Sequence, residues 1–121
     1  MVNFLKNFLK KRIINTIKYS LSGLKATWKL EQAFKMEIIA SLFGIYITFF
    51  SATTKIEKIL LINSLLLILI IELINTGLEK TIDKISKEIH PISKIVKDIG
   101  SAAVFVSLIN AIIIWSIIFL K

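Results

Sequence analysis

Three stretches of this chain are apolar and almost free of charge over lengths that match the thickness of a lipid bilayer. Residues 38–54 and 99–120 hold no charged side chain over 17 and 22 positions, and residues 59–78 hold one, Glu72. A helix needs about 20 apolar residues to cross the hydrocarbon layer, with about 17 as the lower limit. The sequence therefore predicts an all-α membrane protein with three transmembrane helices, at about 36–54, 59–78 and 99–120.

Length and charge add to this picture. With 121 residues and one proline, we expect a single membrane domain over 1–121. The chain lacks cysteine, which excludes a disulfide framework and a thiolate metal site. A balance of 16 Lys and Arg against 8 Asp and Glu would indicate nucleic acid in a soluble protein. In a chain this apolar it indicates an anionic membrane surface instead, and no nucleic-acid partner is expected.

The basic residues are distributed unequally among the segments that flank the spans. Eight precede the first span, two lie in the turn between the first two spans, five lie in 79–98 and one ends the chain. Placing the N-terminus and a 79–98 loop in the cytoplasm puts thirteen basic residues inside and three outside, in agreement with the positive-inside rule. We therefore expect a multi-pass protein with both of these segments on the cytoplasmic side.

Two further patterns concern how the helices meet the membrane and each other. Apolar residues recur every three or four positions among lysines over about 4–28, which predicts an amphipathic helix lying in the membrane interface. Trp28 and Trp115 fit either aromatic anchoring at the two surfaces or ordinary packing. In the third span, a small residue at every fourth position favours close helix contact, within one chain or between subunits. These small residues are Ala103, Ser107 and Ala111.

The second span carries four polar residues on one face of a helix. At about 100° per residue, they lie at about 0°, −60°, −20° and +20°. They are Glu72, Asn75, Glu79 and Asp83. Either Glu72 marks the end of the span or it lies inside the membrane. Glu72 is only about 20 Å along the helix from Ile59, short of the roughly 30 Å hydrocarbon thickness, which favours the second alternative. A carboxylate at that depth is costly and indicates a functional role.

More polar residues gather at the predicted cytoplasmic boundary. They are Glu31 and Glu37 before the first span, and Glu88, His90, Lys97 and Asp98 before the third. Carboxylates from several helices, an amide and lysines can hold Mg²⁺ and a polyphosphate, because magnesium takes few protein ligands and keeps phosphates as others. A partly desolvated glutamate is also a better base toward an alcohol. The simpler interpretations are a solvated face for Glu31 and Glu37, an exposed loop position for His90 and a charged helix cap for Lys97 and Asp98.

Two classes of function fit these residues. One is an enzyme at the interface that uses a nucleotide to phosphorylate a lipid alcohol. The other is a small proton-coupled transporter or channel subunit whose membrane carboxylate cycles protons. A transport carboxylate would sit in mid-membrane with little else polar around it, whereas these acids cluster at one face with lysines and an asparagine. The clustering favours the enzyme.

Three segments resemble the small prokaryotic integral-membrane diacylglycerol kinases. They are YSLSGLKATWKLEQAFKMEIIA (19–40), IIELINTGLEKTIDKI (70–85) and VKDIGSAAV (96–104). The resemblance implies a homotrimer in the bacterial cytoplasmic membrane, with three spans and an interfacial helix per subunit. It also implies transfer of the γ-phosphate of Mg-ATP to a lipid hydroxyl. The GSAAV and EQAFKME segments look like the diacylglycerol branch of the family, with undecaprenol as the alternative substrate.

The same resemblance implies roles for individual residues. The catalytic base corresponds to Glu72, and the metal-binding acids correspond to Glu31 and Glu79, with Asn75 beside them as a further catalytic residue. The positions that contact the nucleotide are Arg12, Tyr19, Glu31, Glu79, Glu88, His90, Lys97 and Asp98. The positions on the lipid side are Arg12, Glu37, Glu72 and Ser101. Ile89 departs from the pattern, because many relatives have tyrosine there.

Overall fold

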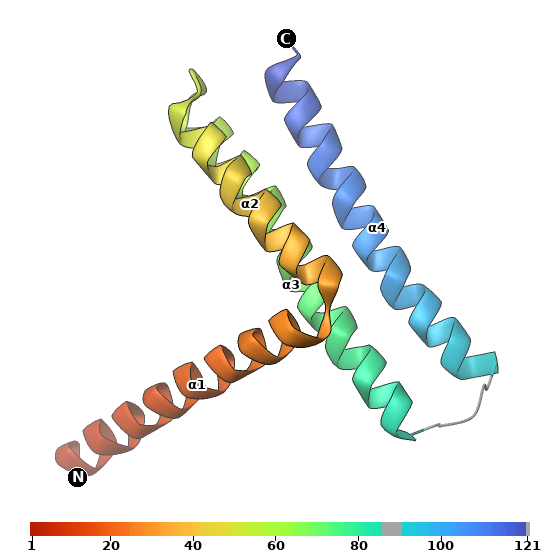
Figure 1. The fold of residues 1–121 in the computed structure, drawn as a ribbon. Helices are drawn as coiled ribbons and strands as arrows, with labels where there is room; N and C mark the ends of the chain where they lie inside the picture. The colour runs from red at the N-terminus through yellow and green to blue at the C-terminus, as the bar shows by residue number, and fades with distance from the viewer. Residues whose placement is uncertain (86–90, 121) are drawn as a thin grey trace. The chain divides into compact units, whose positions relative to one another are not determined.

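The computed structural model describes residues 1–85 and 91–120, and these residues form four α-helices (Figure 1). The helices are α1 (Val2–Leu30), α2 (Gln32–Phe50), α3 (Lys55–Ile85) and α4 (Pro91–Phe119). The last three are each long and apolar enough to cross a membrane. The prediction of an all-α protein with three candidate spans and an N-terminal helix is therefore confirmed. The chain divides into two compact units, Met1–Gln32 and Ala33–Lys121, which are described separately.

The first unit consists of α1 and its C-terminal cap. The helix extends two residues beyond the predicted range of 4–28 at each end. The rings of Phe4 and Phe8 stack with their centroids 6.5 Å apart, as expected for aromatic residues one turn apart. Glu31 ends the helix in an extended conformation, and its backbone N–H donates to the carbonyl of Thr27 at 2.9 Å.

In the second unit, α2 ends at Phe50, four residues before the predicted end of the first span. The next four residues are uncharged but rich in hydroxyl groups, which compete with the helix for backbone hydrogen bonds. The hydroxyl of Ser51 donates to the carbonyl of Thr48 at 2.7 Å. Thr54 and Glu57 then form a reciprocal capping box at 3.0 and 3.2 Å, which starts α3. Charge therefore does not mark where the first span's helix ends.

The segment 79–98, predicted as a loop, is helical over most of its length. α3 continues to Ile85 and α4 begins at Pro91, so helix covers 79–85 and 91–98. Backbone hydrogen bonds hold a helix together in water as well as in lipid, so leaving the apolar layer does not end it. Pro91 stands at the first position of α4, where a missing N–H carries little cost. The remaining loop residues lie outside the described ranges.

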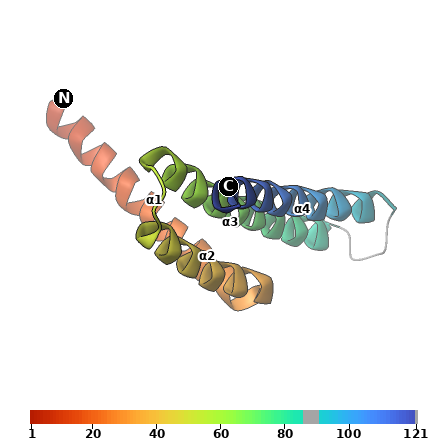
Figure 2. The same cartoon turned by 90° about the horizontal axis from the view of Figure 1, so that it is seen from above.

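α3 and α4 lie side by side and antiparallel, as Figure 1 and Figure 2 both show. One link between them is a hydrogen bond from Trp115 Nε1 to Ser64 Oγ at 3.0 Å. Trp115 therefore takes part in packing between helices, one of the two alternatives that its sequence position allowed. α2 approaches at Gly44, where an added Cβ would lie 2.8 Å from Leu65 Cδ1 and 3.3 Å from the Trp115 ring.

Small residues line the contacts within this unit. Ser107 and Ala111 are buried within the chain, whereas Ala103 is exposed, so only part of the small-residue pattern is used inside one subunit. The buried hydroxyl groups of Thr48, Ser64 and Ser107 donate to carbonyls of their own helices, as in Thr48 to Gly44 at 2.9 Å. These hydroxyl groups can therefore lie between closely packed apolar helices without losing a hydrogen-bond partner.

Candidate active site

The polar stripe predicted on the second span lies on one unbroken helix, α3. Exposure rises steadily along it: Glu72 and Asn75 are 7% and 9% exposed, Glu79 is half-buried and Asp83 is exposed. The four side chains therefore lead from the packed interior of the unit toward its surface near the end of α3. Such a gradient can bring a buried base and a surface-accessible ligand for a cation into one line.

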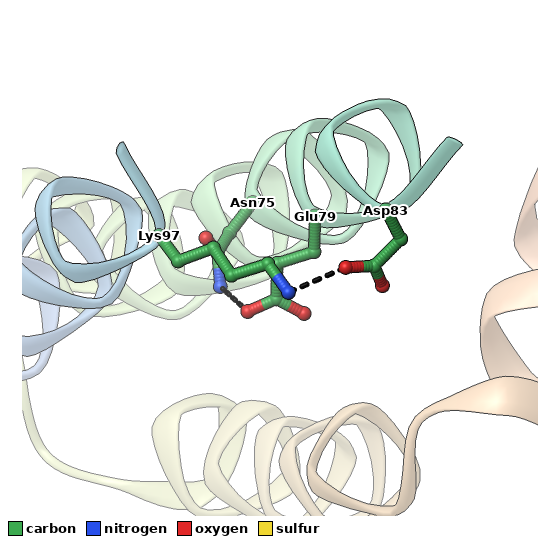
Figure 3. Close-up of polar contacts among 4 residues, drawn as sticks. All are labelled: Asn75, Glu79, Asp83 and Lys97. Carbon is green, nitrogen blue, oxygen red and sulfur yellow. Dashed lines mark hydrogen bonds and ion pairs between the residues drawn. The ribbon is translucent and has the colours of Figure 1, made fainter. Parts of the chain in front are cut away.

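Asn75 and Glu79 act as a pair. Asn75 Nδ2 donates to Glu79 Oε1 at 3.3 Å, across one helical turn (Figure 3). Asn75 Oδ1 is buried and accepts no hydrogen bond from the described residues. The other face of the carboxamide lies against α4 at Gly100, where an added Cβ would overlap Oδ1 and lie 3.2 Å from Cγ. Sequence reasoning missed Gly100, because its place against Asn75 depends on how α3 and α4 meet.

Lys97 reaches across from α4 to the end of the stripe. Its ammonium donates to Asp83 Oδ1, and its side chain passes beside Glu79 (Figure 3). This hydrogen bond, followed by the attraction of the Lys97 charge, lowers the pKa of Asp83 below its ordinary value. Both groups lie beyond the predicted apolar spans. Asp98, the neighbour of Lys97, instead pairs with Lys94 at 2.7 Å on the exposed side of α4.

α2 carries a second carboxylate that is partly buried, that of Glu37. One carboxylate oxygen of Glu37, Oε2, is buried and accepts no hydrogen bond from any residue that the structure describes. Buried polar atoms are nearly always satisfied in folded proteins, so an acceptor of this kind is a candidate contact for a substrate hydroxyl.

The remaining predicted residues are distributed as follows. Ser101 is exposed on α4, directly after Gly100. Arg12 and Tyr19 belong to the Met1–Gln32 unit and line one shallow surface pocket of α1 together with Lys11, Asn15 and Thr16. Glu31 belongs to the same unit. Glu88, Ile89 and His90 lie outside the described residues.

The polar side chains of α3 suit a divalent cation whose remaining ligands are waters and substrate phosphates. In the described residues, no three His, Asp or Glu side chains gather into a metal cluster. Glu79 offers one carboxylate, and the Asn75 carboxamide is hydrogen-bonded to it. Magnesium is commonly held by one or two carboxylates plus waters and substrate phosphates. A hard cation that brings phosphate with it therefore suits this pair.

Comparisons with known proteins agree with the sequence motifs. A family model described as prokaryotic diacylglycerol kinase matches residues 18–119. A protein of Haemophilus influenzae named diacylglycerol kinase is 46% identical over 103 residues, covering 85% of this chain and 87% of the relative. The protein of that name from Escherichia coli K12 is 40% identical over 107 residues, covering 88% of each. One from Pseudomonas aeruginosa is 41% identical over 110 residues, covering 91% of this chain and 89% of the relative.

Proposed function

From the premise that this chain belongs to the prokaryotic diacylglycerol kinase family, we propose how its residues phosphorylate a lipid. Relatives named diacylglycerol kinase match 85–91% of the chain at 40–46% identity. The chain is accordingly an ATP-dependent diacylglycerol kinase of the membrane, and the enzyme prediction is confirmed over the transporter alternative. The observation that carries the proposal is the stripe of α3, in which a buried carboxylate lies two turns from a half-buried one.

Glu72 is the general base. The hydroxyl proton of diacylglycerol moves to the Glu72 carboxylate while the hydroxyl oxygen bonds to the γ-phosphorus. The bond from the γ-phosphorus to the β,γ-bridging oxygen breaks, and ADP leaves. Support comes from burial, because a lipid hydroxyl at the edge of the hydrocarbon layer meets a base that is 7% exposed. Glu37 and Ser101 lie on the lipid side, and the buried Oε2 of Glu37 is available to accept a hydrogen bond from the substrate.

Glu79 and Asn75 face the nucleotide. A magnesium ion held by Glu79 would neutralise charge on the transferring phosphate when bound. The hydrogen bond from Asn75 holds the Glu79 carboxylate in position. Lys97, whose ammonium bonds Asp83, can exchange that carboxylate for a phosphate oxygen, because both are anionic acceptors. The family resemblance also gives metal binding by Glu31 and nucleotide contacts by Arg12, Tyr19, Glu88, His90 and Asp98, and these assignments stay predictions.

The active form in this proposal is a homotrimer. The Ala33–Lys121 unit leaves an apolar groove between α3 and α4, whose lining includes Leu67, Ile71, Ala103 and Val106. A neighbouring subunit fits such a face, since small residues allow close helix contact in lipid. Mixing inactive Glu72→Gln and Glu79→Gln subunits tests whether one site takes these two carboxylates from different chains. Recovered activity would show that it does, and zero activity in folded mixed trimers would show that both carboxylates of a site come from one α3 helix, as proposed.

The proposed orientation puts the N-terminus and the 79–98 segment in the cytoplasm, with α1 in the membrane interface. The natural chain has no cysteine, so single cysteines can be introduced without a background. In intact cells, a membrane-impermeant maleimide should label Thr53→Cys but not Lys6→Cys or Lys84→Cys. The reverse labelling pattern would invert the topology.

The activity itself is tested with purified protein, labelled ATP and either diacylglycerol or undecaprenol. We expect Mg²⁺-dependent labelling of diacylglycerol by the natural chain and none by Glu72→Gln. Preferential labelling of undecaprenol would reassign the substrate. Labelling of neither lipid, together with carboxylate-dependent proton flux in vesicles, would restore the transporter alternative.

A further inference from the structure

Gly100 is the point at which the backbone of α4 comes against the candidate active site. It is buried, and a Cβ added there would overlap Asn75 Oδ1 and lie 3.2 Å from Asn75 Cγ and 3.4 Å from Leu78 Cδ2. The Asn75 carboxamide thus occupies the space that a side chain at position 100 would need. Gly77, on α3 between Asn75 and Glu79, has nothing within 4 Å of its added Cβ, so of these two glycines only Gly100 lies against the Asn75 carboxamide.

The crowded carboxamide is the one that holds Glu79. Asn75 has one edge against Gly100, while Nδ2 on the other edge donates to Glu79 Oε1 at 3.3 Å. The atom in the way of a Cβ is the far end of a side chain, so turning the carboxamide relieves the overlap more easily than parting two packed helices. A turn of that kind moves Nδ2 away from Glu79. The expected result of a side chain at position 100 is a misplaced Glu79 carboxylate in a protein that still folds.

We propose that Gly100 is a positioning residue. Because position 100 has no side chain, the Asn75 carboxamide can keep the orientation in which it donates to Glu79, and this hydrogen bond holds the Glu79 carboxylate in place for the Mg-nucleotide. The inference rests on the proposed function. Groups that orient a metal ligand typically contribute about 10- to 100-fold in metal affinity or activity. Gly100→Ala should therefore weaken Mg-ATP binding and raise the KM for Mg-ATP by about that factor. The KM for diacylglycerol should stay unchanged, because the Glu72 end of the stripe is not touched.

Two glycine variants serve as matched controls. Gly44→Ala also crowds a close helix contact, but its added Cβ meets Leu65 and Trp115 and neither Asn75 nor Glu79. It should affect unfolding without affecting Mg-ATP binding. Gly77→Ala meets open space and should change neither ligand's binding. Titration with a fluorescent ATP analogue in Mg²⁺ measures binding without turnover. Equal Mg-ATP affinity for Gly100→Ala and the natural chain, or equal loss in Gly44→Ala, would overturn the inference.

A double-variant cycle separates positioning from packing. In an Asn75→Ala background the overlapping carboxamide is gone, so Gly100→Ala should cause no further loss of Mg-ATP affinity. There it should raise stability like any exchange of glycine for alanine within a helix. An equal loss of affinity in both backgrounds would refute the proposal. If Gly100→Ala alone cannot be purified, a double variant less stable than Asn75→Ala also refutes it, and one of equal or greater stability supports it.

The same measurements distinguish failure of the proposed kinase function from failure of the positioning role of Gly100. A natural chain that neither binds Mg-ATP nor phosphorylates diacylglycerol removes the proposed function, and this inference falls with it. Normal binding and turnover by the natural chain, with an unaffected Gly100→Ala, removes the inference alone.

Discussion

Exchanging Glu72 or Glu79 for glutamine removes one carboxylate from the same helix face at two different depths. The two residues are seven positions apart, or about 10 Å along α3. Glu72 is 7% exposed, and Glu79 is half-buried and hydrogen-bonded to Asn75. We therefore expect different kinetic signatures from chemically identical substitutions.

Glu72→Gln should lose turnover and keep nucleotide binding. A general base typically contributes about 10²- to 10⁴-fold to the rate, or about 3–5 kcal/mol of transition-state stabilisation. A group that acts only in the transition state lowers kcat without weakening the ground-state complex, so the Kd for Mg-ATP should be unchanged. The variant should also be more stable by about 1 kcal/mol, a fraction of the roughly 2.5–3.5 kcal/mol that a charged residue costs at the centre of a membrane helix.

Glu79→Gln should lose both turnover and nucleotide binding. Removing a ligand's carboxylate leaves part of the Mg-ATP charge uncompensated, so affinity should fall by at least the roughly 10- to 100-fold typical of outer-shell partners. The assays are lipid phosphorylation in mixed micelles, nucleotide titration and thermal unfolding of each variant. Glu57→Gln is the control, because it removes a carboxylate from the same helix and glutamine can retain the capping box.

Nucleotide affinity distinguishes a general base from a ligand of the nucleotide complex. If Glu72→Gln bound Mg-ATP as weakly as Glu79→Gln, Glu72 would be a ligand of the nucleotide complex, and its assignment as the base would be wrong. A Glu72→Gln variant less stable than the natural chain would contradict the argument from burial separately.

Three further predictions concern the fold. Trp115→Phe removes the hydrogen bond to Ser64 and should cost about 0.6 kcal/mol, the average for such bonds in membrane proteins, in detergent unfolding. The pKa of Asp83 is below its usual 3.8, so its ionised form contributes stability above that pH, and this contribution is lost as pH falls through the lower folded value. Asp83→Asn should abolish this acid dependence, as should Lys97→Met, whereas unchanged acid unfolding of either variant would contradict the ion pair. Thr54→Ala removes a helix cap and should lower the unfolding free energy by about 1 kcal/mol, measured by thermal denaturation.

Much of the fold follows from local pattern. Charge-free runs located three spans, because the length of helix that lipid requires is a property of each segment alone. The same local pattern misplaced the ends of the helices. Hydroxyl-rich residues 51–54 end α2 without any charge, and helix continues through the charged residues 79–85 that were predicted as loop. Charged residues indicate where the chain passes from lipid to water. A helix instead ends where its backbone N–H and C=O groups form hydrogen bonds outside the helix.

The stripe of α3 follows from the amino-acid sequence alone, because helical periodicity places Glu72, Asn75 and Glu79 on one face whatever surrounds them. The family motifs added the chemistry that this stripe is proposed to perform. The contacts of Gly100 with Asn75 and of Lys97 with Asp83 come from the packing of α4 on α3. Those contacts depend on the relative rotation and register of α3 and α4. The packing of two helix surfaces sets these quantities, and the repeat of neither helix alone can specify them.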